Sequence, residues 1–420
     1  MKILLKQVTV ADPLSPFNGS VKDILISNGI IEKIDGSLEA DGEATTITGL
    51  TVSPGWVDIF SHFCDPGLEY RETLESGAAA AAAGGYTQVF VVPNTNPLVD
   101  NKSQVEYIVQ KSKALPVKIH PLGAVTKGIE GKELAEMYDM QSNGAVAFSD
   151  GILPVQSAGL MLKALQYVKA FNGVVIQVPV DKSIGQYGLM NEGIISTRLG
   201  LPGMPAIAEE LIIQRDIELL KYTGSKLHIT GVSTAKGLSL IAAAKEQGLE
   251  ITCSVAPYQV FFCDEDLQEY DTNLKVNPPL RTRQDMLALR EGVKSGLIDC
   301  IASHHIPQNW DSKTCEFEYA KNGMLSLQTA YAAVNTAIPG LSSNRLVELF
   351  STKSRSIFNL PLATINEGAT AELTLFAGDE KFTLQKKDIK SKSYNSPFIL
   401  QQLSGRVAGI ISKGNIIINE

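Results

Sequence analysis

The stretch PGWVDIFSHFCDPGLEYRETLESGAAAAAAGGYTQVFVVPNTNP, residues 54–97, decides the fold of this 420-residue chain. It begins with a short apolar strand, continues into a helix over 71–83 that ends at Gly84-Gly85, and closes with an apolar strand over 87–94. Strand, helix and strand in this order predict a βαβ unit with parallel strands. The alanine-rich face of the helix predicts close packing against those strands.

The same alternation continues to about residue 305 and predicts a (β/α)₈ TIM barrel, an α/β fold. No Gly-rich dinucleotide fingerprint or P-loop follows a strand, which argues against the nucleotide-binding folds. Active sites of such barrels lie at the C-terminal ends of the strands, so we expect functional side chains there. Further strands are predicted at 144–150, 173–178, 225–232, 250–256 and 297–305, and further helices at 103–112, 157–171, 205–222, 234–247 and 283–295.

The two ends of the chain have a different sequence pattern, which predicts mainly short strands. Residues 21–36 predict a hairpin that turns at Asn28-Gly29, and Lys413-Gly414-Asn415 marks a second hairpin. We therefore predict a small β-sandwich domain formed by 1–50 together with 366–420, and a barrel formed by 51–365.

Composition limits the kinds of partner. The net charge is −8 and no Lys/Arg run forms a basic stripe, so nucleic acid is not expected as a partner. The five cysteines are odd in number, irregularly spaced and without a CxxC pair, which is typical of reduced thiols in the cytosol. No signal peptide and no apolar run of about 20 residues occurs. The sequence predicts a cytoplasmic protein without a membrane segment.

Several blocks, in the same order, resemble dihydroorotases of the bacterial long-chain type. Besides residues 54–97 they are LMNEGIISTRLGLPGMPAIAEE (189–210), YDTNLKVNPPLRT (270–282), LVELFSTKSRSIFNLP (346–361) and GRVAGIISKGNII (405–417). The resemblance extends over almost the whole chain. It implies a metal-dependent hydrolase barrel with a two-ended β domain, and an activity in pyrimidine biosynthesis, the zinc-dependent hydrolysis and closure of the dihydroorotate ring.

The residues that would hold zinc in that family are mostly replaced here. The first barrel strand of the family ends in Asp-x-His-x-His-x-Arg, where both histidines bind metal and the arginine grips the substrate carboxylate. In this chain the segment is 58–64, in which Phe60 replaces the first histidine, His62 retains the second, and Cys64 replaces the arginine.

The other family ligand positions are changed in a similar way. An acidic residue is kept at Asp150, whereas Val178, Gly231 and Tyr258-Gln259 stand where the family has histidines. The position of the metal-binding aspartate that acts as general base is His304. Because zinc needs three or four N, O or S donors and Phe, Val and Gly provide none, we expect no metal and no catalytic residue. If a metal binds, the expected ligands are His62, Asp150 and His304.

Other positions match the family's substrate pocket. Asn94, Asn277, Cys64 and His305 are the pocket candidates. The alternative is structural: the two asparagines keep the loops at the barrel rim in shape, Cys64 is a small buried thiol, and His305 is a packed histidine. His120 and His228 lie within strands and are expected to be core histidines with hydrogen-bond partners.

A lost active site on a retained scaffold suggests a role through surface contacts. Some bacteria carry a non-catalytic dihydroorotase-like chain that packs with aspartate transcarbamoylase, and this sequence resembles such a chain. We therefore expect a pseudoenzyme that forms a homodimer and serves as a partner or scaffold for aspartate transcarbamoylase. Two alternatives stay open: an active dihydroorotase or related cyclic amidohydrolase with an altered zinc site, and a small-molecule sensor that uses the old pocket.

Overall fold

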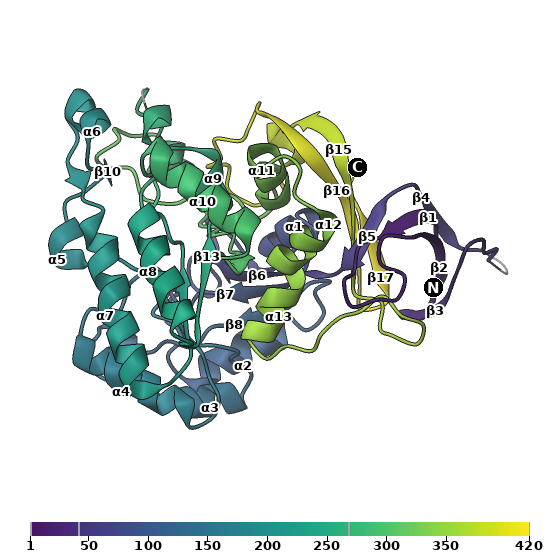
Figure 1. Ribbon diagram of the computed structural model, residues 1–420, viewed down its shortest axis with the longest axis horizontal. Coiled ribbons are helices and arrows are strands. Elements are labelled where there is room, and N and C mark those ends of the chain that lie inside the picture. Colours follow the sequence, from purple (N-terminus) through teal and green to yellow (C-terminus); the bar gives the residue numbers. More distant parts are fainter. Residues whose placement is uncertain (1, 41–42, 268, 420) are drawn as a thin grey trace.

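A computed structural model describes residues 2–40, 43–267 and 269–419. It consists of a barrel surrounded by helices and a sheet built from both ends of the chain, which lies to the right in Figure 1. The predicted TIM barrel with a β domain from the chain ends is confirmed. Within the described residues, no helix is long and apolar enough to cross a membrane.

The terminal sheet has eight strands in the order β17-β16-β15-β5-β1-β2-β3, with β4 paired to β1. Both predicted hairpins are confirmed, because the turn residues Asn28-Gly29 and Lys413-Gly414 have the positive φ that a tight two-residue turn requires. Residues 51–54 also pair in this sheet, so it extends four residues beyond the boundary expected at residue 50. The strands are Lys2–Val10 (β1), Val21–Ser27 (β2), Ile30–Asp35 (β3), Thr45–Thr48 (β4), Thr51–Pro54 (β5), Leu373–Thr383 (β15), Gln402–Ser412 (β16) and Asn415–Ile418 (β17).

The barrel strands are parallel and form two arcs, β6-β7-β8 and β9-β12-β13-β14. Isolated parallel bridges at Phe148 join the arcs on one side, and a bridge from Ser61 to His305 joins them on the other. The barrel strands are Trp56–Ser61 (β6), Tyr86–Val91 (β7), Lys118–Pro121 (β8), Val175–Gln177 (β9), Leu227–Thr230 (β12), Ile251–Val255 (β13) and Cys300–Ile301 (β14); Met190–Asn191 (β10) and Gly203–Met204 (β11) pair separately.

The barrel strands are all shorter than the predicted ranges, and two of them are reduced most. The strand at 144–150 is reduced to bridges at Phe148, because the Asp150 carboxylate, rather than a neighbouring backbone carbonyl, accepts the N–H groups of Val125 and Thr126. The strand at 297–305 keeps regular pairing only over Cys300–Ile301, and its extended backbone ends at His304, which has φ of 47°.

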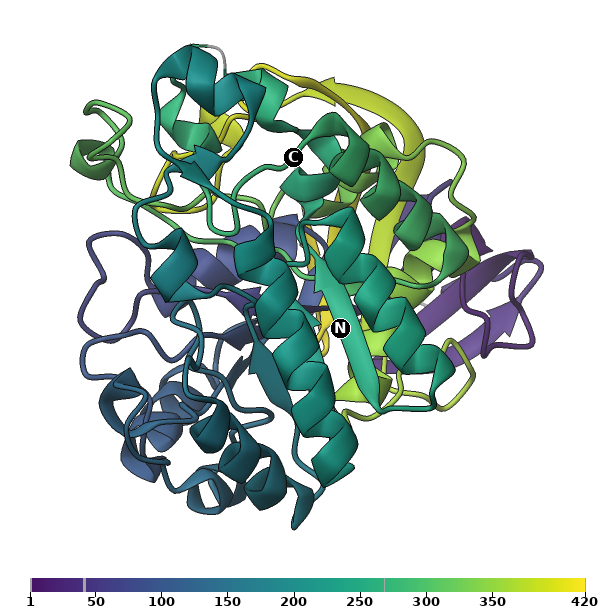
Figure 2. The same ribbon diagram turned by 60° about the vertical axis from the view of Figure 1, so that its left-hand side comes forward.

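Helices cover the outside of the barrel, and Figure 2 shows the teal and green helices lying over the strands. All six predicted helices are present. The one predicted at 71–83 begins only at Leu74, because Thr73 caps it in a reciprocal box with Ser76, which leaves residues 71–73 in the preceding loop. The helices are Leu74–Ala83 (α1), Lys102–Lys111 (α2), Met137–Ser142 (α3), Ala158–Lys169 (α4), Lys182–Gly185 (α5), Ile194–Leu199 (α6), Ile207–Thr223 (α7), Ala235–Glu246 (α8), Pro257–Phe261 (α9), Arg283–Ser295 (α10), Ala330–Ala337 (α11), Ser343–Val347 (α12) and Lys353–Ile357 (α13).

Trp56 connects the barrel to the terminal sheet. Its fully buried ring packs against Tyr331, Phe350 and Phe376 with centroid distances of 5.1, 5.0 and 5.4 Å, and its N–H donates to the Ser53 hydroxyl. Phe376 belongs to β15, so this cluster joins the two parts of the chain.

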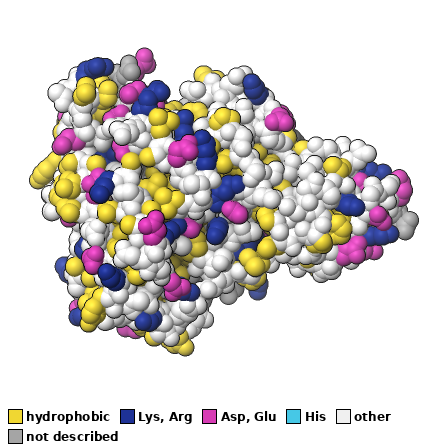
Figure 3. Space-filling model, in the orientation of Figure 1, with side chains coloured by type: hydrophobic (Ala, Val, Ile, Leu, Met, Phe, Trp, Pro, Cys, Tyr) yellow, Lys and Arg dark blue, Asp and Glu magenta, His cyan; other side chains and the backbone are white. Residues whose placement is uncertain are grey.

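The surface turned to the viewer in Figure 3 carries acidic and basic side chains interspersed.

Candidate functional site at the barrel mouth

The C-terminal ends of β6 and β14 meet at the barrel mouth and are fixed by a buried carboxylate. Asp58 accepts hydrogen bonds from the backbone N–H of Ser303 at 2.6 Å, from the Ser303 hydroxyl at 2.8 Å and from the Ser61 hydroxyl at 2.5 Å. Burial raises the pKa of Asp58, and these hydrogen bonds oppose that rise. The residues that follow, 60–64 and 303–308, therefore lie side by side.

His62 is buried with both ring nitrogens engaged. Its Nδ1 accepts the N–H of Cys64 at 3.0 Å, and its Nε2 lies 3.1 Å from the carbonyl of Asn94. A backbone N–H can only donate and a carbonyl can only accept, so the neutral tautomer with a proton on Nε2 satisfies both contacts. Burial lowers the pKa of His62 to about 3, with a smaller contribution from the charge on Arg71.

His304 forms a stacked pair with Phe60. The two rings lie 4.4 Å apart between centroids with an interplanar angle of 26°, and His304 Nε2 lies 2.8 Å from the Thr230 hydroxyl. A Cβ added to Gly231 would lie 2.6 Å from Cε1 of this imidazole, so the ring occupies the space that a side chain at 231 would need. The residues at 60, 231 and 304, which differ from those of the family, are therefore packed against one another.

A chain of polar side chains continues from His304 into the barrel. The hydroxyl of Thr230 accepts from the Ser254 hydroxyl at 2.9 Å, and Ser254 lies 2.9 Å from Nε2 of His228. The Nδ1 of His228 in turn lies 2.8 Å from the Thr252 hydroxyl. His228 thus has partners on both nitrogens, and His120 contacts Gln88 at 2.7 Å, as expected for core histidines.

Asp150 and Asn94 hold a turn rather than face open space. Asp150 accepts from the N–H groups of Val125 and Thr126, both at 2.9 Å, and from the Thr126 hydroxyl at 2.6 Å. The Asn94 side chain donates to the Asp150 carbonyl and accepts the N–H of Ile152, both at 3.0 Å. These contacts give Asn94 a structural part at the rim.

The donors at the mouth do not fit a zinc ion. The neutral His62 tautomer has no free lone pair, Asp150 is bound to the 125–126 turn, and His304 stacks on Phe60. Phe60 and Val178 instead belong to the apolar cluster inside the barrel. Among the described residues, no group of three or more His, Cys, Asp or Glu side chains is arranged to hold a metal.

The remaining pocket candidates differ in their surroundings. Cys64 is fully buried, and burial raises the pKa of its thiol to about 12, so it stays protonated and is a poor nucleophile. Asn277 lines a groove of about 470 Å³ together with Val180, Lys182 and Asn322. Its side-chain oxygen is buried and lacks a hydrogen-bond partner within the described structure.

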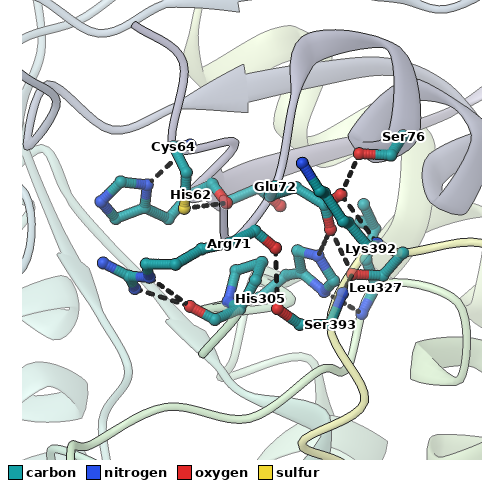
Figure 4. A network of polar contacts seen from close by, with 12 residues as sticks. His62, Cys64, Arg71, Glu72, Ser76, His305, Leu327, Lys392 and Ser393 are labelled. Atoms are coloured by element: carbon teal, nitrogen blue, oxygen red, sulfur yellow. Dashed lines mark hydrogen bonds and ion pairs between the residues drawn. The ribbon is translucent and has the colours of Figure 1, made fainter. Parts of the chain in front are cut away.

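His305 belongs to a polar network that ties the C-terminal segment to the barrel (Figure 4). Its Nε2 lies 3.5 Å from the carboxylate of Glu72, which also accepts hydrogen bonds from the hydroxyls of Ser76 and Ser391 and from the N–H of Lys392. These contacts lower the pKa of Glu72 against the effect of burial, which raises it. Glu72 cannot be recognised as a network residue from the sequence, because nothing in its local pattern indicates a partner more than 200 residues away.

The packing of His304 over Gly231 generates a stability prediction. Gly231→Ala is expected to destabilise the protein by about 1–3 kcal/mol, because the new Cβ overlaps the imidazole and Gly231 has φ of 73°. In a His304→Ala background the cost should be smaller. Urea unfolding of the parent protein, the two single variants and the double variant measures the cost in each background. Gly248→Ala is the matched control, since Gly248 has φ of 76° with nothing within 4 Å. Equal costs in both backgrounds would contradict this packing.

The buried histidines generate a prediction about pH. Burial lowers the pKa of His62, His120, His228 and His304 to about 3, while the unfolded chain titrates near 6.5. The unfolded state therefore binds more protons below that pH. The contribution of these histidines to the free energy of unfolding is complete above about pH 6.5. As the pH falls toward 3, each histidine lowers that free energy by up to about 1.4 kcal/mol per pH unit.

A single substitution isolates one of these histidines. His120→Gln should show a shallower fall in unfolding free energy between about pH 7.5 and about pH 5.5 than the parent protein does. Denaturant titrations at several pH values measure both slopes. Identical slopes would mean that His120 titrates in the folded state as it does in the unfolded chain.

Comparisons with known proteins agree with this architecture. A family described as dihydro-orotase-like matches residues 49–237. Among solved structures, the L-hydantoinase (dihydropyrimidinase) from Arthrobacter aurescens superimposes with a TM-score of 0.85 over 99% of this chain and 96% of that chain, at 23% identity. At that identity the likeness establishes the fold.

Relatives of full length establish the family. A dihydroorotase from Acetivibrio thermocellus is 40% identical over 423 residues, covering 100% of this chain and 99% of that protein. A dihydroorotase from Syntrophus aciditrophicus is 38% identical over 426 residues, covering 100% of both. With this identity along its whole length, the chain belongs to the dihydroorotase family of cyclic amidohydrolases.

Proposed function

We propose that this chain is a dihydroorotase-family protein of pyrimidine biosynthesis that does not hydrolyse the dihydroorotate ring and instead acts as a partner of aspartate transcarbamoylase. The loss of catalysis is supported above all by the stacked pair of Phe60 and His304 over Gly231. This pair occupies the family's metal positions with a packed, neutral arrangement. Without a metal, an attacking water keeps its pKa of about 15.7 and little hydroxide forms at neutral pH.

A second candidate is an active dihydroorotase with an altered metal site. It is favoured by the comparisons, since full-length relatives at 37–41% identity carry the name dihydroorotase. The two candidates thus rest on different observations: overall similarity favours an enzyme, and the local geometry favours a protein without the zinc reaction. A third candidate is a small-molecule sensor. It is supported by the groove beside Asn277 and by the side-chain oxygen of Asn277, which has no hydrogen-bond partner within the described structure.

Metal content and activity separate the first two candidates. Protein purified at neutral pH without chelators should contain substoichiometric zinc and should neither hydrolyse nor close the dihydroorotate ring. Elemental analysis and an absorbance assay measure the two quantities. Stoichiometric zinc with turnover at the rate of the relatives would establish the second candidate.

A reconstructed site sharpens this test. The variant with Phe60→His, Cys64→Arg, Val178→His, Gly231→His and His304→Asp should gain zinc. The matched control contains the same changes except His304→Asp, and it should not gain zinc because the imidazole still fills the space beside residue 231.

The partner role has a separate test. The chain mixed at micromolar concentration with the aspartate transcarbamoylase subunit from the same organism should co-elute with it on size exclusion. Because each folded protein is stabilised by binding the other, the melting temperature of this chain should also rise in the mixture. The chain run alone reports whether it forms the proposed homodimer. Separate elution of the two proteins, with unchanged melting temperatures, would exclude a stable complex at this concentration.

A further inference from the structure

Arg71 is a buried arginine in the loop between β6 and α1. Its side chain is 8% exposed, and its Nε and Nη2 donate to the carbonyl of Pro307 at 2.8 and 2.6 Å. Its backbone is fixed as well, since its N–H donates to Leu68 and its carbonyl accepts the hydroxyl of Ser393. The guanidinium is therefore held in one orientation at the barrel mouth.

The charge of Arg71 has no direct counter-charge. Within the described residues, no carboxylate oxygen lies within 4 Å of its guanidinium. The more deeply buried arginines differ, because Arg281 lies 3.8 Å from Glu209 and Arg355 is paired with Glu372. A guanidinium stays protonated in proteins, and a single carbonyl dipole does not neutralise it. An anion beside Arg71 would supply the missing charge.

Part of the guanidinium of Arg71 is left without a partner among the residues that the structure describes. The Pro307 carbonyl uses Nε and one hydrogen of Nη2, whereas Nη1 makes no hydrogen bond within the described structure and is not among the fully buried unpaired atoms. The outer fork of Nη1 and Nη2 is thus available. Figure 4 shows the guanidinium extending away from Glu72, on the side where the His62 ring lies.

We propose that Arg71 binds the carboxylate of a small anionic ligand at the barrel mouth. A guanidinium fork matches the two oxygens of a carboxylate, and both groups gain from contact in a partly desolvated site. Cys64, a neutral buried thiol nearby, offers no such contact. This proposal does not depend on whether the protein hydrolyses the ring.

Two probes that differ only in the carboxylate test this role. L-Dihydroorotate and dihydrouracil share the ring, but dihydrouracil lacks the acid group. In calorimetric titrations with EDTA present, the parent protein should bind dihydroorotate at least about tenfold more tightly, as expected for charge-assisted hydrogen bonds. Binding of neither probe at millimolar concentration, or equal binding of both, overturns the proposal. Since EDTA removes zinc and no turnover is needed, this result is separate from the test of catalysis.

Variants assign the preference to the arginine. Arg71→Gln should abolish it, and Cys64→Arg in the Arg71→Gln background should restore it by supplying a guanidinium from the neighbouring position. Arg406→Gln is the matched control, because that arginine is on the surface and pairs with Glu380. An Arg71→Gln protein that keeps the preference overturns the proposal. If Arg71→Gln does not fold, Arg71→Lys decides: it keeps the charge but loses the fork, so the preference should fall several-fold, and an unchanged preference overturns the role.

Discussion

The buried carboxylate of Asp58 closes the barrel, and the arrangement of the mouth depends on it. It accepts hydrogen bonds from the backbone N–H and the hydroxyl of Ser303. Two residues further along, the same segment is held again, because the N–H of His62 donates to the carbonyl of His305. A carboxylate in this position loses its hydration, and the hydrogen bonds from two serines and a backbone amide compensate for that loss. Since β6 and β14 are the first and last strands of the barrel, this contact joins segments that are more than 200 residues apart in the chain.

Around this contact, several buried polar groups of the mouth are hydrogen-bonded to one another. The carbonyl of Asn94 and the N–H of Cys64 engage His62, and the hydroxyls of Thr230 and Ser254 link His304 to His228. Buried imidazoles with such partners are neutral and do not need a metal for stability. Arg71 stands apart from this pattern, because its charge is matched by a carbonyl alone.

Much of the fold could be predicted from local sequence. Periodicity located the six long helices, and the Asn-Gly and Lys-Gly pairs fixed both hairpin turns. The strand at 144–150 was overestimated because an apolar run does not reveal that a side chain, Asp150, takes over the role of a ladder carbonyl. Alignment with the family identified the changed positions at 60, 231 and 304, but not that they touch, since the positive φ of His304 and the direction of its ring arise only in three dimensions.

The contact between His304 and Gly231 limits which substitutions the chain can accept one at a time. A histidine at 231 and the present imidazole of His304 would fill one volume, because an added Cβ at 231 already lies 2.6 Å from that ring. A side chain at 231 therefore requires that residue 304 change before it or together with it. A substitution at 231 alone would create a clash. The order of mutations thus decides which variants of this barrel mouth can be reached through folded intermediates.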